Sequence, residues 1–155
     1  MTIYFSHVGE YSCFSNSSLY GFELDGYWWK TSEHFFQAQK CVGTPFYHQI
    51  RLAFDARQAF HLGRSCPLRT DWKEVRIMEM KRGILKKFET NQDIRGLLLS
   101  TKNELIVENY PKDSFWGCGL HGQGENQLGK ILVEVRDLIR QGGSNYGKDN
   151  CDNRA

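Results

Sequence analysis

The stretch Thr31-Ser32-Glu33-His34-Phe35-Phe36-Gln37-Ala38-Gln39-Lys40 predicts the helix around which the rest of the chain is organised. Thr31 or Ser32 can cap its first turn, in which the acidic Glu33 suits the positive end of the helix dipole. At about 100° per residue, Glu33, Gln37 and Lys40 fall on one stripe, with Phe36 beside it. Phe35, Ala38 and Val42 fall on the other side and are expected to be buried.

Charged residues along a helix usually face water, and that is the simplest interpretation of the stripe. The residues before the helix favour a different one, because Tyr27-Trp28-Trp29 runs directly into it. Bulky aromatic side chains are therefore expected beside Glu33, Gln37 and Lys40 in place of open solvent.

A hairpin is predicted immediately before this helix. Phe22-Glu23-Leu24 and Tyr27-Trp28-Trp29 are strand-like, and Asp25-Gly26 between them suits a type I′ turn. Other strands are expected at 2–5 and 104–108. Other helices are expected at 44–54, at 56–62, from 91 or 93 to 99, and at 127–141. One more helix is expected from 71 onward, with Asp71 as its cap. The predicted fold class is α+β, with a small sheet made of the N-terminal strand, the hairpin and residues 104–109, packed with several helices.

At 155 residues the chain is long enough to bury its own core in a single compact domain. We expect this domain to span residues 1–143. Residues 144–155 are polar and almost without apolar side chains, so they are expected to form a disordered tail.

Charge and cysteine content limit the class of protein. A net charge of +2, from 20 basic and 18 acidic residues, argues against a protein held on nucleic acid mainly by its overall charge. No apolar run approaches the roughly 20 residues of a membrane span, and the N-terminus lacks a signal-peptide pattern. The five cysteines form no CxxC pair and are expected to be reduced thiols. We therefore expect a cytoplasmic protein without a metal, a cofactor, a membrane contact or an obligate protein partner.

Two features are candidates for binding an anion. Arg64 and Arg69 bracket a loop after the helix expected at 56–62, where arginines either compensate a helix dipole or clamp a phosphate with their forked donors. The second is residues 117–124, with four glycines in eight residues, followed by a helix whose amides near 124–127 are expected to be free for a phosphate. This stretch is neither a Walker loop nor a GxGxxG turn, and a mobile glycine loop is the alternative.

A family resemblance runs through the same segments. Trp29-x-Thr31-Ser32-Glu33-His34-x-Phe36-Gln37-Ala38-Gln39-Lys40 resembles the signature of the NADAR family, which includes the YbiA-like N-glycosidases. Further matches follow in the family's order, over roughly residues 3–141: Phe14-Ser15-Asn16, Gly63-Arg64, Arg69-x-Asp71-Trp72, Lys87-Phe88, Leu105-x-Val107-Glu108, Asp113-x-x-Trp116-Gly117-x-Gly119 and Gly124-x-Asn126-x-Leu128-Gly129. Spaced identities in a fixed order are far more specific than one short motif.

The resemblance implies hydrolysis of a ribosyl N-glycosidic bond. Such a reaction needs a carboxylate that activates water or stabilises the positive charge developing at C1′. The resemblance carries over Glu33 and Asp113 as these carboxylates and Trp72 and Trp116 as walls that stack on the base, and Lys40 joins the catalytic set. The other residues expected to bind substrate are Ser15, Asn16, Gln37, Arg64, Gly117, Gly122, Gly124 and Asn126, with Ser15 and Asn16 bonding the ribose or phosphate.

The mechanism and the substrate remain open at this point. Lys40 either balances charge or attacks an opened ribose as an amine and forms a Schiff base. The substrate is either a phosphoribosylamino-pyrimidine intermediate of riboflavin synthesis or ADP-ribose attached to guanine, including guanine in nucleic acid. The first needs room for a single phosphate, and the second needs room for a diphosphate and an adenosine.

A non-catalytic module that binds ADP-ribose or NAD is the alternative from another class. It would need the arginines, glycines and tryptophans but not both carboxylates. Because Glu33, Lys40 and Asp113 are all retained, the sequence favours an enzyme.

Overall fold

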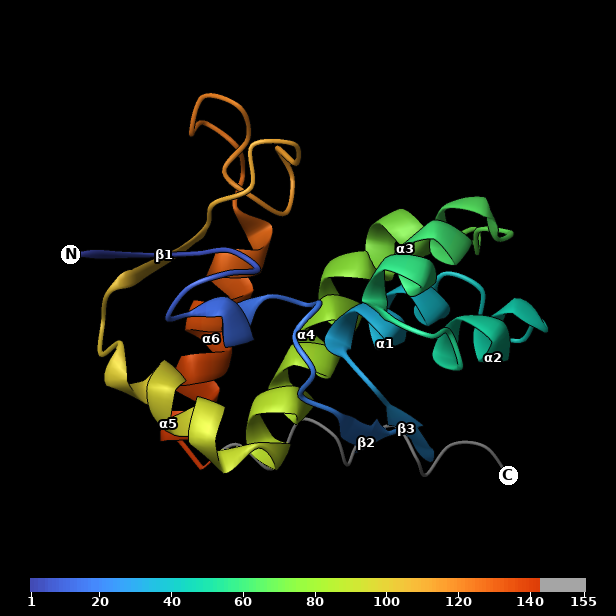
Figure 1. Ribbon diagram of the computed structural model, residues 1–155, viewed down its shortest axis with the longest axis horizontal. Helices are drawn as coiled ribbons and strands as arrows, with labels where there is room; N and C mark the ends of the chain where they lie inside the picture. The colour runs from blue at the N-terminus through green and yellow to red at the C-terminus, as the bar shows by residue number, and fades with distance from the viewer. Residues whose placement is uncertain (143–155) are drawn as a thin grey trace.

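The computed structural model describes residues 1–142 of the chain. One long helix, α4 (Trp72–Thr90), crosses the middle of the fold (Figure 1). The other elements, in chain order, are β1 (Thr2–Phe5), the 3-10 helix η1 (Ser12–Phe14), β2 (Phe22–Leu24), β3 (Tyr27–Trp29), α1 (Ser32–Gln39), α2 (Phe46–Arg51), α3 (Ala56–Ser65), α5 (Gln92–Ser100), β4 (Leu105–Glu108) and α6 (Gln127–Arg140).

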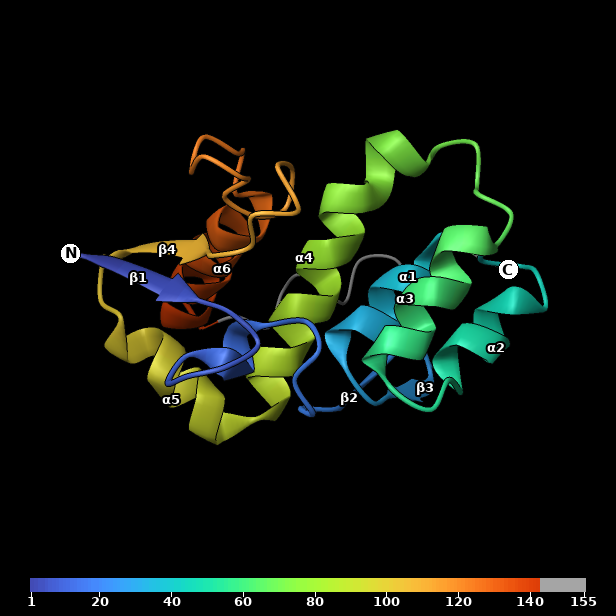
Figure 2. The same ribbon diagram turned by 45° about the horizontal axis from the view of Figure 1, so that its top comes forward.

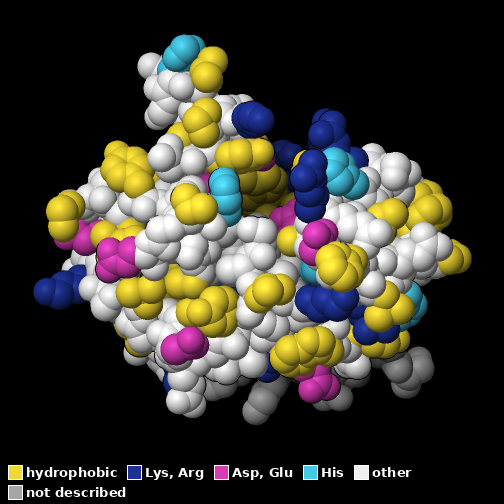
Figure 3. Space-filling view, in the orientation of Figure 1, with side chains coloured by type: hydrophobic (Ala, Val, Ile, Leu, Met, Phe, Trp, Pro, Cys, Tyr) yellow, Lys and Arg dark blue, Asp and Glu magenta, His cyan; other side chains and the backbone are white. Residues whose placement is uncertain are grey.

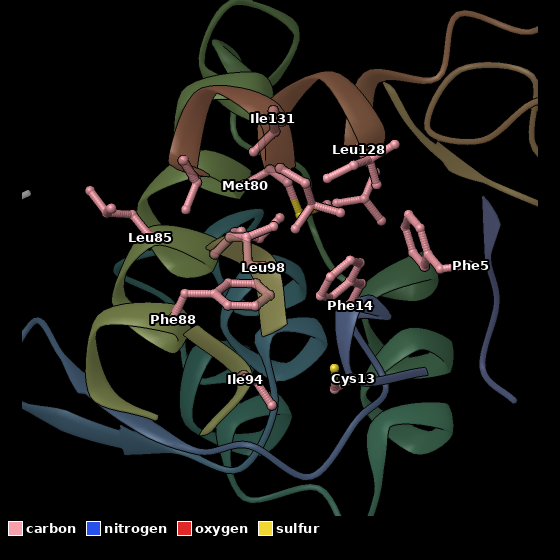
Figure 4. Close-up of a cluster of buried hydrophobic side chains, with 14 of the residues drawn as sticks. Phe5, Cys13, Phe14, Met80, Leu85, Phe88, Ile94, Leu98, Leu128 and Ile131 are labelled. Atoms are coloured by element: carbon pink, nitrogen blue, oxygen red, sulfur yellow. The ribbon is translucent and has the colours of Figure 1, made fainter. Parts of the chain in front are cut away.

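Helix α4 separates two groups of elements, each with its own set of buried apolar side chains. Strands β1 and β4 and helices α5 and α6 lie on one side of it, and α1, α2 and α3 lie on the other (Figure 2). On the first side, the α4 side chains Met80, Ile84 and Phe88 pack with Phe14, with Leu98 and with side chains of α6 (Figure 4). The second set is built on the hairpin and α1–α3: Phe22, Trp29, Phe35, Ala38, Cys41, Ile50, Ala53 and Ala59.

The expected single sheet is wrong, because the structure has two separate sheets of two strands. Strand β1 pairs with β4 in parallel, and β2 pairs with β3 in antiparallel fashion. The chain after β1 carries the hairpin to the far side of α4, so its strands do not reach β1 (Figure 2). The turn itself is as predicted, since Asp25 (φ 54°) and Gly26 (φ 82°) both have the positive φ that a type I′ turn requires.

Helix α1 begins as predicted and is buried more completely than predicted. The Thr31 side chain caps it by accepting a hydrogen bond from the His34 N–H. Phe35 and Ala38 are fully buried, as expected, but Val42 is 51% exposed. The reason is that the helix ends at Gln39, which leaves Val42 in the turn beyond it.

Helices α2, α3 and α4 differ from the prediction. Helix α2 is shorter than predicted, running only from Phe46 to Arg51 in place of 44–54. Helix α3 is capped by Asp55, as the pattern indicates, but continues to Ser65 past Gly63. Helix α4 begins at Trp72 without a side-chain cap, because the Asp71 carboxylate accepts hydrogen bonds from Arg69 at 2.6 and 3.0 Å instead.

None of the helices within residues 1–142 is long and apolar enough to cross a membrane. The predicted tail at 144–155, and residue 143 at the predicted domain boundary, lie outside the described residues.

Candidate active site

A hollow opens on the face of the molecule shown in Figure 3, between the loop that follows β4 and the side formed by α3 and the start of α4. Apolar and acidic side chains are visible at its floor, and Lys, Arg and His side chains surround its mouth (Figure 3). This combination suits a ligand with an apolar ring and a negatively charged group.

An aromatic wall is formed by Phe36, Trp72 and Trp116, which come from α1, α4 and the loop after β4. The Phe36 ring lies 5.1 Å from the Trp72 ring and 5.2 Å from the Trp116 ring, measured between centroids. Trp72 is only 7% exposed, whereas Trp116 is half-buried. The two predicted tryptophans are thus brought together through Phe36.

Glu33 is held in place by its own backbone and by a neighbouring amide. Its N–H donates to the Asn16 carbonyl at 3.0 Å, and its carboxylate accepts a hydrogen bond from Gln37 Nε2 at 2.7 Å. Burial raises the pKa of the Glu33 carboxyl, the Gln37 hydrogen bond and the charge of Lys40 lower it, and the charge of Asp113 raises it. Lys40 and Asp113, the other two predicted catalytic residues, therefore both lie within electrostatic reach of Glu33.

Lys40 follows α1 directly and is half-buried, with its Nζ 6.0 Å from the centre of the Phe36 ring. Burial lowers the pKa of its amine, the charge of Glu33 raises it, and the charge of Arg64 lowers it. Arg64 is exposed near the end of α3, close enough to Lys40 for this effect. The surroundings thus favour the neutral amine more than water does.

Asp113 is held by the loop that it begins. Its Oδ1 accepts hydrogen bonds from the backbone N–H groups of Phe115 (2.9 Å) and Trp116 (2.8 Å). The carboxylate therefore fixes the position of Trp116, and within residues 1–142 its second oxygen, Oδ2, accepts no hydrogen bond.

The loop with Ser15 and Asn16 supports helix α1. The Asn16 amide donates to Met80 Sδ at 3.3 Å, and its Oδ1 accepts a hydrogen bond from Ser32 Oγ at 2.7 Å. The Ser15 hydroxyl pairs with that of Ser17 at 3.0 Å. Both ends of the Asn16 side chain thus bond within the protein, and its backbone carbonyl holds the start of α1 by accepting from the Glu33 N–H. The expected contact of Asn16 with ribose or phosphate stays a prediction.

The amides at the start of α6 are not free, contrary to the prediction. The N–H groups of residues 124–128 donate to carbonyls of residues 114–118, at distances of 2.6–3.1 Å. Asn126 bonds β4, because its Nδ2 donates to the Ile106 carbonyl at 2.9 Å and its Oδ1 accepts from the Glu108 N–H at 3.0 Å. The loop therefore satisfies its own backbone and offers no helix N-terminus to a phosphate.

The glycines of this loop differ in their surroundings. A Cβ on Gly124 would lie 2.5 Å from the Gly117 carbonyl oxygen, and a Cβ on Gly117 would lie 3.0 Å from the Tyr110 carbonyl oxygen. Both glycines are needed for this close packing. Gly122 has a positive φ of 70° and lies exposed, with no heavy atom of the described residues within 4 Å of an added Cβ beyond its chain neighbours.

The two predicted arginines are not equivalent. Arg69 is tied to Asp71, so the clamp of two arginines is reduced to Arg64.

Gln37 lies against α3 at Gly63, where an added Cβ would come within 2.0 Å of its Oε1. The absence of a side chain at Gly63 therefore allows Gln37 to reach Glu33.

The NADAR domain family matches residues 4–140 of the chain. The chain belongs to the NADAR family. It is 47% identical over 146 residues to N-glycosidase Npun_R5314 of Nostoc punctiforme, covering 90% of this chain and 94% of that protein. It is 38% identical over 138 residues to N-glycosidase YbiA of Escherichia coli, covering 88% and 86%. The expectation of an enzyme, a hydrolase that acts on N-glycosyl compounds, is confirmed by these relatives.

The fold of this NADAR domain has a solved counterpart. The NMR structure of E. coli YbiA superimposes with a TM-score of 0.84 at 38% identity, covering 91% of this chain and 86% of that one. The α+β class is therefore confirmed. A further relative is the riboflavin biosynthesis protein PYRR, chloroplastic, of Zea mays, which is 35% identical over 146 residues, or 83% of this chain and 23% of that protein.

Two residues of the NADAR domain lie among the site residues although the sequence analysis assigned neither of them a role. Glu108 ends β4, and burial together with the charges of Asp113 and Glu33 raises the pKa of its carboxyl to about 7. The Arg76 guanidinium lies over the Phe115 ring, 3.8 Å from its centre, next to Trp116. The available signals for Glu108 were its place in the family match Leu105-x-Val107-Glu108 and an acid at the end of an apolar strand, two residues after the buried Ile106.

Proposed function

We propose that the chain hydrolyses the N-glycosidic bond between a phosphorylated ribose and its base. The observation that carries this proposal is that the charges of Lys40 and Asp113 both act on the Glu33 carboxyl, although Asp113 comes from a loop far along the chain from α1. The aromatic wall beside them gives a flat base a surface on which to stack.

In this proposal Glu33 takes a proton from the attacking water, since Gln37 fixes one of its oxygens and no donor among residues 1–142 bonds the other. Asp113 Oδ2 stabilises the positive charge that develops at C1′ as the bond to the base lengthens. Lys40 and Arg64 supply positive charge for the phosphate at the mouth of the site. The lowered pKa of Lys40 also supports the competing route, in which its amine attacks the opened ribose.

The proposed substrate is a phosphoribosylamino-pyrimidine intermediate of riboflavin synthesis. One support is the similarity to a relative named as a riboflavin biosynthesis protein. The other is the set of phosphate donors, because Arg69 and the amides of residues 124–128 are engaged within the protein. Arg64 and Lys40 remain of the predicted donors, which suits a single phosphate better than the diphosphate of ADP-ribosylated guanine.

We further propose that residues 1–143 form the catalytic domain and that the reaction takes place in the cytoplasm. The free thiols of Cys13, Cys41, Cys66 and Cys118 fit a reducing compartment.

Release of free base tests the proposed function. Purified protein is incubated separately with the phosphoribosylamino-pyrimidine and with ADP-ribosylated guanosine, and the products are separated by chromatography. We expect ribose 5-phosphate and free pyrimidine from the first substrate, and loss of both with Glu33→Gln. Faster release from the guanine substrate would reassign the substrate, and tight binding of ADP-ribose without any release would favour the non-catalytic module.

A further inference from the structure

Glu108 lies on the inward face of β4. Neighbouring residues of a strand point to opposite faces, and residues two apart share a face. Ile106, two residues earlier, is 1% exposed and belongs to the apolar core, whereas Leu105 is 66% exposed. The Glu108 carboxyl is therefore directed inward at the point where the apolar core ends and the site begins.

The backbone of Glu108 fixes it relative to the loop that holds Asp113. Its N–H donates to Asn126 Oδ1 at 3.0 Å. Its carbonyl accepts hydrogen bonds from the N–H groups of Tyr110 and Cys118, both at 2.9 Å. The loop of residues 110–118 is thus bonded at both ends to the Glu108 carbonyl. Asp113 belongs to this loop and is therefore held close to Glu108.

The three carboxyl groups of the site have different partners. Glu33 receives the Gln37 hydrogen bond and the positive charge of Lys40, and Asp113 receives two backbone hydrogen bonds. Within residues 1–142, no N–H or O–H group donates a hydrogen bond to the Glu108 carboxyl, and the charges that act on it are the negative ones of Asp113 and Glu33. Burial and both charges raise its pKa to about 7, so this carboxyl still carries its proton in a large share of the molecules near neutral pH.

We propose that Glu108 is the general acid that protonates the departing base. This assignment rests on the proposed function and adds a third carboxyl to it. A departing amine or ring nitrogen that would otherwise leave as an anion needs such a proton, and an inward-facing neutral carboxyl beside the ribose site can deliver it.

The step balances without a co-reactant other than water. The C1′–N bond breaks, its electron pair stays on the nitrogen, and that nitrogen takes the proton of Glu108. Water adds its oxygen to C1′ and releases one proton to Glu33. Transfer of this proton back to Glu108 restores the starting state, so each turnover consumes one water molecule.

The test compares kcat against pH for the wild type, Glu108→Gln, Glu108→Asp and Glu23→Gln. Glu23 is an exposed glutamate of β2 and serves as the matched control. In the wild type we expect kcat to fall as the pH rises above 7, where Glu108 loses its proton. Glu108→Gln should lower kcat by about 10²–10⁴-fold and abolish that fall, and Glu108→Asp should restore part of the rate because it keeps an acid.

Several outcomes would overturn the assignment. Unchanged kcat in Glu108→Gln, or a decline above pH 7 that persists in this variant, would rule out Glu108 as the acid. If Glu108→Gln loses its near-UV circular dichroism, Glu108→Asp decides in its place, and a folded Asp variant without any recovered rate refutes the role. Turnover that is lost in Glu33→Gln but normal in Glu108→Gln refutes this proposal alone, whereas a wild type inactive on both substrates refutes the proposed function and this proposal with it.

Discussion

Glu108→Gln should change how the stability of the protein depends on pH. The pKa of Glu108 is raised from 4.5 to about 7 in the folded protein. Because the folded protein holds this proton more tightly than the unfolded chain, the contribution of Glu108 to the free energy of unfolding is full below pH 4.5. It falls as the pH rises and is lost once the pH has passed 7. Glutamine has no proton to lose and makes no such contribution.

The size of the effect follows from the difference in pKa. At about 1.36 kcal/mol per pH unit, the wild type should lose about 3 kcal/mol of stability relative to Glu108→Gln between pH 4.5 and pH 8.5. Most of this change should fall between pH 5 and 7, where the folded protein is protonated at Glu108 and the unfolded chain is not.

Urea unfolding followed by tryptophan fluorescence measures this difference at a series of pH values, with Glu23→Gln as the control that should follow the wild type. The contrary outcome is a difference in unfolding free energy between the wild type and Glu108→Gln that changes by less than about 0.5 kcal/mol over this pH range. It would show that Glu108 ionises like an exposed glutamate. That result would also remove the proton on which the proposed acid role depends.

Further predictions concern the catalytic residues, one packing contact and the C-terminal segment. Glu33→Gln should lower turnover by about 10²–10⁴-fold and keep ligand affinity, as kinetics and calorimetry can measure, and near-normal turnover would exclude it as the base. Borohydride added during turnover should leave the intact mass unchanged if Lys40 only balances charge, whereas an adduct of protein plus ribosyl fragment would establish the Schiff base. Gly63→Ala should displace Gln37, lowering kcat about tenfold and reducing the Tm, and an unchanged kcat would show that Glu33 does not depend on this amide. Removing residues 144–155 should leave Tm and activity nearly unchanged, because the segment has almost no apolar side chains to bury, and a drop of several degrees would contradict this.

Local features of the fold could be predicted from the sequence. The Asp25-Gly26 turn, the strand at 2–5 and the cap at Asp55 depend on residues within a few positions of one another, and all three are confirmed. The pairing of β1 with β4 depends on segments about a hundred residues apart, so no local pattern could separate it from pairing with the hairpin.

The residues of the candidate site were predicted mainly through the family resemblance. It carried over Glu33 and Asp113, the chemistry of an amine among aromatic residues added Lys40, and in the structure the charges of Lys40 and Asp113 both act on Glu33. Asn16 and Asn126 were harder, because an asparagine bonds a ligand or a backbone equally well, and tertiary contacts decide which. Glu108 stood in a family match but was given no role, because a strand-end acid usually faces water.

The two hydrogen bonds of Asn126 have a consequence for how the molecule meets its neighbours. Strand β4 is paired with β1 along one side only, and a strand edge left open can recruit a strand from another molecule. The Asn126 amide occupies the Ile106 carbonyl and the Glu108 N–H, the two groups through which a neighbouring strand would pair. One side chain thus takes the place of a third strand and protects the β4 edge of a very narrow sheet from edge-to-edge aggregation.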